Sequence, residues 1–152
     1  MGDVRFSQIQ VREILGLEPE TVRHWRKCLP SLKAKPRRAA YGRADLLALA
    51  VVREFVHDLG IPVSSLTPVA DDLFRLCGSR PWPYLSRCQL RLEDGHLALE
   101  HADAPMSLAR RSAVLVPLAP LIMRLGQALL GDDGEAQPEL RFPLTAQRGG
   151  RS

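Results

Sequence analysis

The segment that decides the fold comprises residues 19–29 and reads PETVRHWRKCL. Pro19 and Glu20 favour the start of a helix, because a proline in the first turn loses no hydrogen bond and a carboxylate there faces the positive end of the helix dipole. Val22, Trp25 and Leu29 follow at helical spacing and predict a buried stripe. The outer face of this helix is then polar and consists of Thr21, Arg23, His24, Arg26 and Lys27.

A shorter helix is expected immediately before this segment. Ser7 is a favourable N-cap residue, and Gly16 is a favourable residue for ending a helix after Leu15. Two short helices joined by a turn of about three or four residues that contains glycine form a helix-turn-helix. The sequence therefore predicts this arrangement over residues 7–29.

The positive charge of the chain is concentrated around this region. The net charge is +4, from 21 Lys and Arg residues and 17 Asp and Glu residues. Eight of the cations lie between Thr21 and Ala44, where there is no Asp or Glu, which leaves 13 cations against all 17 acids elsewhere. Such a one-sided run across a helix and the loop after it favours a phosphate-binding surface over a merely solvated face.

The next part of the chain predicts a loop and two more helices. Residues 30–42 contain two prolines and several cations, which indicates a loop or a short β-ribbon. A long apolar helix is expected over residues 43–59, with Gly60 as its stop. Thr67 is expected to cap a fourth helix that runs to Cys77.

The pattern changes near residues 77–83, where Pro81-Trp82-Pro83 indicates a boundary. Residues 88–93 and 96–101 alternate in hydropathy on either side of Asp94-Gly95, which predicts a β-hairpin. Residues 113–116 predict a third strand.

The expected fold class is therefore α+β. An N-terminal winged helix-turn-helix domain that is mostly helical spans residues 1–78. A small α+β module with the hairpin and an amphipathic helix spans residues 79–131. The tail, residues 132–152, is rich in Gly, Asp, Glu, Pro and Gln, so we expect it to be disordered.

The amphipathic helix, expected from Leu118 to Leu130, carries the most apolar unassigned face. Two interpretations remain open: this stripe forms a homodimer interface, or it closes the C-terminal core. A small module gains buried surface by oligomerising, which favours the dimer. The residues of the stripe are Leu118, Leu121, Ile122, Leu125 and Leu129.

Four short motifs occur in order along the N-terminal half. They are ILGL at residues 14–17, ETVRHW at 20–25, YGRADL at 41–46 and LGIPVSSL at 59–66. Together they make residues 6–74 resemble the MerR-type winged helix-turn-helix of bacterial transcriptional regulators. The long dimerisation helix that typically follows in that family is replaced here by the Pro-Trp-Pro segment, the hairpin and one helix.

The resemblance implies binding to double-stranded DNA, with residues 19–28 as the recognition helix. In that docking geometry Arg23 pairs with guanine and His24 reaches a base edge, while an ion pair between Arg23 and Glu20 is the alternative for Arg23. One recognition helix contacts few base pairs, so a homodimer on paired half-sites is expected. The expected DNA-binding residues are Thr21, Arg23, His24, Arg26, Lys27, Lys33, Lys35, Arg37, Arg38, Tyr41 and Arg43.

Other classes of function are not favoured. No group of residues forms a catalytic constellation or a phosphate-cradling loop, so we expect no enzyme and no cofactor. His24 and Cys28 are spaced to share a metal but lack further ligands, so no metal is expected. The N-terminus does not read as a signal peptide and no apolar run is long enough for a membrane span, so a cytoplasmic protein without a membrane partner is expected.

Two alternatives to a regulator remain. One is an excisionase-like or architectural protein that bends DNA, and the other is an adaptor that keeps the winged-helix fold but binds protein. The C-terminal module is expected to dimerise, or to bind an effector or a partner protein.

Overall fold

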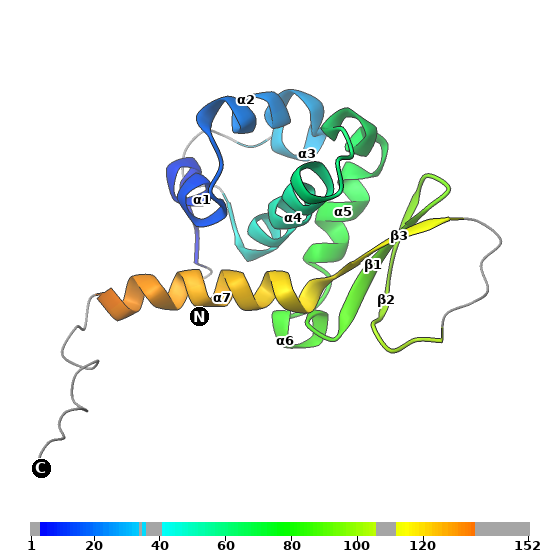
Figure 1. Cartoon of the computed structure of the whole chain (residues 1–152). Helices are drawn as coiled ribbons and strands as arrows, with labels where there is room; N and C mark the ends of the chain where they lie inside the picture. The colour runs from blue at the N-terminus through cyan, green and yellow to red at the C-terminus, as the bar shows by residue number, and fades with distance from the viewer. Residues whose placement is uncertain (1–3, 34, 36–40, 106–111, 136–152) are drawn as a thin grey trace, which may run out of the picture.

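The computed structural model describes residues 4–33, 35, 41–105 and 112–135. Helix α4 (Arg43–Arg53) lies at the centre, with the other helices of the N-terminal half around it and a small sheet to one side (Figure 1). Every residue from Leu46 to Val52 is buried. The α+β class is confirmed.

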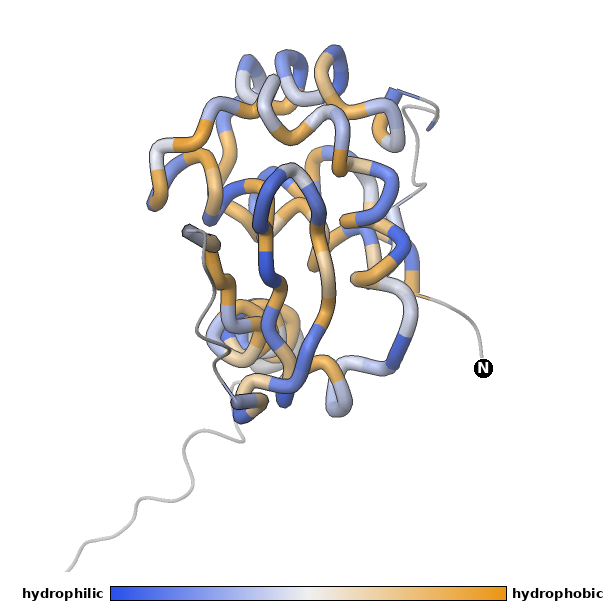
Figure 2. The backbone as a smooth tube through the Cα atoms, turned by 90° about the vertical axis from the view of Figure 1, so that its right-hand side faces the viewer, coloured by the Kyte–Doolittle hydropathy of each residue, from blue (hydrophilic) through white to orange (hydrophobic). Residues whose placement is uncertain are grey.

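Helices α1 (Gln8–Leu15) and α2 (Pro19–Cys28) form the expected pair. The Ser7 side chain accepts a hydrogen bond from the backbone of Gln10, and Gly16 ends α1 with a φ of 66°. Glycine is favoured there because other residues rarely adopt a positive φ. Val22 and Trp25 are buried, as their spacing predicts, and Figure 2 shows hydrophilic and hydrophobic residues alternating along the turns at the top of the molecule.

The segment after α2 differs from its expectation. A short helix, α3 (Pro30–Lys33), occupies the start of the expected loop. Tyr41 then pairs with Phe6 as an isolated antiparallel bridge. The expected β-ribbon falls largely on residues 34 and 36–40, which lie outside the described residues.

The predicted third helix continues from α4 as a π-helical turn, Glu54–Asp58, before Gly60. The predicted start of the fourth helix is wrong. Residues Val63–Val69 form a 3₁₀ helix, and α5 (Ala70–Cys77) begins after it. Thr67 caps no helix, because its hydroxyl donates a hydrogen bond of 2.7 Å to the carbonyl oxygen of Cys28 and so ties the 3₁₀ helix to the end of α2.

The C-terminal half begins with a short helix, α6 (Trp82–Leu85), which accommodates Pro83 in its first turn. Strands β1 (Cys88–Glu93), β2 (His96–His101) and β3 (Ala113–Pro117) form an antiparallel sheet of order β2-β1-β3. The hairpin turns at Asp94 and Gly95, whose φ values of 55° and 76° are those of a tight two-residue turn. The hairpin and the third strand are confirmed.

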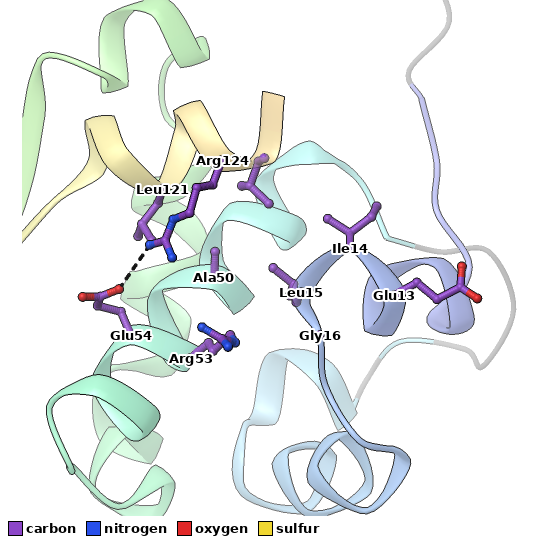
Figure 3. A pocket seen from close by; sticks show the side chains of 10 residues that line it. Glu13, Ile14, Leu15, Gly16, Ala50, Arg53, Glu54, Leu121 and Arg124 are labelled. Atoms are coloured by element: carbon purple, nitrogen blue, oxygen red, sulfur yellow. Dashed lines mark ion pairs between the residues drawn. The ribbon is translucent and has the colours of Figure 1, made fainter. Parts of the chain in front are cut away.

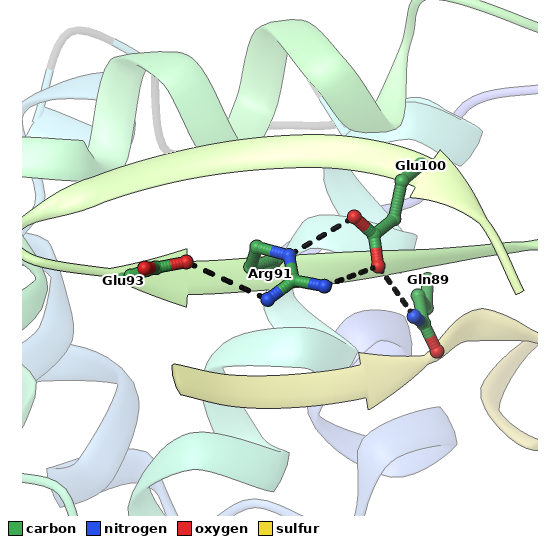
Figure 4. A network of polar contacts seen from close by, with 4 residues as sticks. All are labelled: Gln89, Arg91, Glu93 and Glu100. Carbon is green, nitrogen blue, oxygen red and sulfur yellow. Dashed lines mark hydrogen bonds and ion pairs between the residues drawn. The ribbon is translucent and has the colours of Figure 1, made fainter. Parts of the chain in front are cut away.

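The two faces of the sheet differ in polarity. Leu90, Leu97 and Val116 are buried on the inner face. On the outer face the Arg91 guanidinium donates to both carboxylate oxygens of Glu100, at 3.0 and 3.1 Å, and Figure 4 shows Gln89 and Glu93 completing the network. Polar residues thereby cover the open face of the sheet.

Helix α7 (Leu118–Glu135) follows β3 directly and packs against α1 and α4. Leu118, Leu121 and Leu125 are buried in the same hydrophobic cluster as α4, so the core is continuous across the expected boundary at residue 78. The helix also extends past its expected end at Leu130. Residues 132–135, expected in the tail, are helical, and residues 136–152 lie outside the described residues.

Among the described helices, none combines the length and the apolar character that a membrane span requires.

The outer network of the sheet predicts a pH dependence of stability. Hydrogen bonds from Arg91, and next from Gln89, hold the pKa of Glu100 below its ordinary value of 4.5. Since the folded state favours the charged form, the network stabilises the fold above that pH and loses its contribution as the pH falls through the lower folded pKa. We expect Glu100→Gln to lower the free energy of unfolding at neutral pH by about 1 kcal/mol at most.

Urea unfolding at a series of pH values tests this expectation. The variant is expected to lose less stability than the parent between about pH 5 and pH 3. Asp103→Asn, which removes an exposed carboxylate just after β2, serves as the control. Equal slopes for the parent and Glu100→Gln would contradict the proposed contribution of the network.

Candidate nucleic-acid interface

The outer face of α2 presents cations because its inner face is anchored in the core. Trp25 is 2% exposed and Val22 is 7% exposed, which fixes the rotation of the helix. Arg23, His24 and Lys27 are consequently exposed, while Thr21 is half-buried. The helix therefore presents two cations and a histidine on one accessible face.

A groove of about 410 Å³ lies beside this face, between α1, α2 and α3. It is lined by Gln8, Ile9, Pro19 and five cations, and no acidic residue is among its lining residues. Such a groove favours an anionic partner, since its lining carries an excess of positive charge. The five cations are Arg12, Arg23, Arg26, Lys27 and Lys33.

Arg23 adopts the alternative contact that its spacing allows. Its Nη1 lies 2.6 Å from a carboxylate oxygen of Glu20, and the two side chains are 61% and 80% exposed. An exposed pair of this kind on a helix contributes only about 0.2–0.5 kcal/mol. The pair therefore orients Arg23 but offers little resistance to a competing acceptor.

Arg26 instead links α2 to Lys35 and Tyr41, which lie on either side of residues 36–40. Its guanidinium donates hydrogen bonds to the hydroxyl of Tyr41, at 2.9 Å, and to the carbonyl oxygen of Lys35, at 2.8 Å. Lys35 itself forms an ion pair of 3.1 Å with Asp45 at the start of α4. Tyr41 is 1% exposed, so its hydroxyl accepts a hydrogen bond from Arg26 and is not presented to solvent.

The remaining expected residues are scattered. Lys33 is exposed at the end of α3, beside the groove. Arg43 turns toward the C-terminal half, where its guanidinium lies 5.7 Å from the ring centroid of Trp82. Arg37 and Arg38 lie outside the described residues. The structure thus brings together only part of the predicted set.

The possible metal pair does not gain further ligands. The Nε2 atom of His24 lies 3.9 Å from the Sγ atom of Cys28. Within the described ranges, no group of three or more metal-ligating side chains comes together.

Sequence reasoning missed Arg12 and Gln8. Both lie on α1, before the cationic run that drew attention to residues 21–44, and they line the groove because α1 packs beside α2. Their spacing of four residues places them on the same face of α1, which was the signal available in the sequence.

Comparison with known proteins locates the similarity in this half of the chain. Residues 7–73 match the family model described as MerR HTH family regulatory protein. This confirms the resemblance for the N-terminal region and supports a DNA-binding transcriptional regulator. No curated protein and no solved structure matches the chain.

The contacts of Arg26 predict that its main contribution is to stability. We expect Arg26→Met to lower the free energy of unfolding by about 1–3 kcal/mol, because the buried Tyr41 hydroxyl loses its partner. Lys27→Met removes the neighbouring exposed cation and is the matched control, with an expected change near zero. Urea unfolding measures both, and equal effects of the two variants would contradict the role assigned to Arg26.

Proposed function

We propose that this chain, with its MerR-type helix-turn-helix, is a sequence-specific transcriptional regulator that acts as a homodimer in the cytoplasm of a bacterium or in a phage-infected cell. The observation that carries the proposal is the cationic groove beside α2, which lies within the residues that match the family model. The proposed function includes no enzymatic step and no cofactor.

The proposed docking divides the cations by what they contact. Helix α2 enters the major groove, where the exposed Arg23 exchanges Glu20 for the O6 and N7 atoms of guanine. His24 lies on the same face and contacts a neighbouring base edge. Arg12, Lys27 and Lys33 contact phosphates, which fixes the position of the helix without reading sequence.

Two substitutions separate base reading from phosphate binding. We expect Arg23→Ala to weaken binding to the preferred site by about 1–3 kcal/mol and to relax the preference at one position. Lys27→Ala is expected to weaken binding to all sequences alike and to lower the slope of log affinity against log salt by about one unit. Fluorescence anisotropy on duplexes selected from random DNA measures both effects.

The outcomes of this experiment also address the alternatives. If neither substitution changes binding, docking through α2 is wrong. A parent protein with no salt-dependent DNA affinity favours the adaptor. A parent protein that binds but strongly bends its site, as seen by the migration of circularly permuted fragments, favours the architectural protein.

The dimer interface needs a different face of α7 from the predicted stripe. Leu118, Leu121 and Leu125 are buried within the protomer, so they close the core as the second interpretation predicted. An adjacent stripe of the same helix is apolar and accessible. It consists of Ala119, Met123, Gly126 and Leu130, of which Met123 and Leu130 are 63% and 68% exposed, whereas Ile122 and Leu129 of the predicted stripe are half-buried against the core.

A second copy of the chain is the occupant we propose for this stripe. Helix α7 is connected to the helix-turn-helix through contacts with α1 and α4 and through an ion pair of 3.5 Å between Arg124 and Glu54, in the π-helical turn after α4 (Figure 3). Helices α2 and α7 lie on opposite sides of α4 (Figure 1). Pairing through α7 would therefore leave both α2 helices accessible and set the distance between two half-sites.

Substitutions on the two faces of α7 distinguish interface from core. We expect Met123→Asp to give a folded monomer with much weaker binding to a two-half-site duplex, because the charge is placed in the interface. Leu125→Asp is expected to unfold the protein, since it places a charge in the core. Ala128→Asp, at an exposed position on the side of α7 away from the stripe, is the control.

Sedimentation velocity and circular dichroism report the oligomeric state and the folding of each variant. A parent protein that is monomeric at micromolar concentration both free and on its DNA site would exclude the dimer.

A further inference from the structure

A second cationic pocket lies between the N-terminal segment, the start of α4 and the segment that joins α5 to α6. Its volume is about 550 Å³, within the range of small-molecule sites, and its lining includes Arg5, Arg43, Arg80 and Trp82. Arg5 precedes the residues that match the family model and Arg80 follows them. None of the contacts proposed for α2 uses this pocket.

The charge of the pocket is unbalanced. Three arginines line it, and Asp45 is the one acidic residue among its lining residues. The Asp45 carboxylate already accepts a hydrogen bond of 2.9 Å from the backbone of Gly42 and pairs with Lys35 at 3.1 Å. Arg43 and Arg80 are therefore not balanced by Asp45, which favours an anionic ligand.

Aromatic rings position two of the arginines. The Arg43 guanidinium lies 5.7 Å from the ring centroid of Trp82, and that of Arg80 lies 5.0 Å from the centroid of Tyr84. Contact with a ring face leaves the N–H groups in the plane of a guanidinium free to donate to an oxyanion. Both arginines are exposed on the surface.

Close backbone approaches shape the same pocket. A Cβ atom at Gly42 would lie 3.3 Å from Nη1 of Arg5, so that guanidinium rests directly against the turn before α4. A Cβ atom at Gly78 would lie 3.1 Å from the Cβ of Ala44, so the end of α5 packs tightly against α4. These glycines let three separate segments converge.

The indole N–H of Trp82 does not contribute to the pocket. Its Nε1 atom is buried and has no hydrogen-bond partner among the residues that the structure describes. The atom is inaccessible, so Arg43 and Arg80, both exposed, are the donors that the pocket offers to a ligand.

We propose that this pocket binds a phosphate group, with Arg43 and Arg80 as its principal ligands. Phosphate matches the chemistry of the site because guanidinium groups donate paired hydrogen bonds to its oxygens. The group belongs either to a free phosphate compound or to the DNA backbone, since Arg43 is two residues from Tyr41, which is bonded to Arg26 of α2. Binding of a DNA phosphate in this pocket rests on the proposed function, whereas binding of a free phosphate compound does not.

The first arm of the test uses pyrophosphate and isothermal titration calorimetry in potassium acetate. The parent is expected to bind pyrophosphate, and Arg80→Ala to weaken that binding by about tenfold or more because a charge-assisted hydrogen bond is lost. Arg75→Ala is the matched control: Arg75 is an exposed arginine on α5 that pairs with Asp72 and does not line the pocket. Its affinity is expected to equal that of the parent.

The second arm measures DNA affinity against salt for the same three proteins. If the pocket holds a backbone phosphate, Arg80→Ala lowers the slope of log affinity against log salt by about one unit and Arg75→Ala leaves it unchanged. An effect in the first arm alone assigns the site to a free phosphate compound, and an effect in the second alone assigns it to DNA.

The proposal is overturned if Arg80→Ala behaves as Arg75→Ala in both arms. Its failure is distinguishable from failure of the proposed function. If the parent binds DNA through Arg23, and Arg80→Ala changes neither pyrophosphate binding nor the salt dependence of DNA binding, only the proposal of a phosphate pocket is refuted. If the parent does not bind DNA but binds pyrophosphate through Arg80, only the proposed function as a transcriptional regulator is refuted.

Discussion

The burial of α4 on all sides is the constraint on which the rest of the structure depends. A helix whose surface is apolar all round has to be covered completely, and no single neighbour can do this. Helices α1 and α5 cover part of α4, and Leu121 and Leu125 of α7 join the same cluster. The helix-turn-helix therefore completes its core with a helix from the far end of the chain.

Local sequence signals were sufficient to predict the structure wherever the conformation of a short segment depends on that segment alone. The cap at Ser7, the stop at Gly16 and the turn at Asp94-Gly95 each depend on contacts within a few residues, and the structure confirms all three. Thr67 shows the limit of such reasoning. It has the residue type of an N-cap, but a contact with Cys28, 39 positions away, determines its role instead.

The candidate site divides in the same way. Helical periodicity predicted which side of α2 is exposed, because Val22 and Trp25 had to face inward. It could not predict that Arg26 bonds Tyr41 or that Arg43 turns toward Trp82, since these contacts join segments separated by 15 and 39 positions. Residue type thus identified the cations, whereas the tertiary fold decided which of them remain available to a partner.

Helix α7 shows why one apolar stripe admitted two interpretations. The predicted stripe treats Leu118, Leu121 and Leu125 as one face, but these residues lie at the edge of a wider apolar arc that also includes Met123 and Leu130. A sequence pattern reports only the width of such an arc. The position of α4 decides how the arc is divided, because the side that covers α4 becomes core and the remainder stays accessible. The same helix therefore closes the core of the protomer and keeps an accessible apolar side for the second copy in the proposed dimer. Because α7 contacts α1 and α4, the proposed dimer would be coupled directly to the helix-turn-helix.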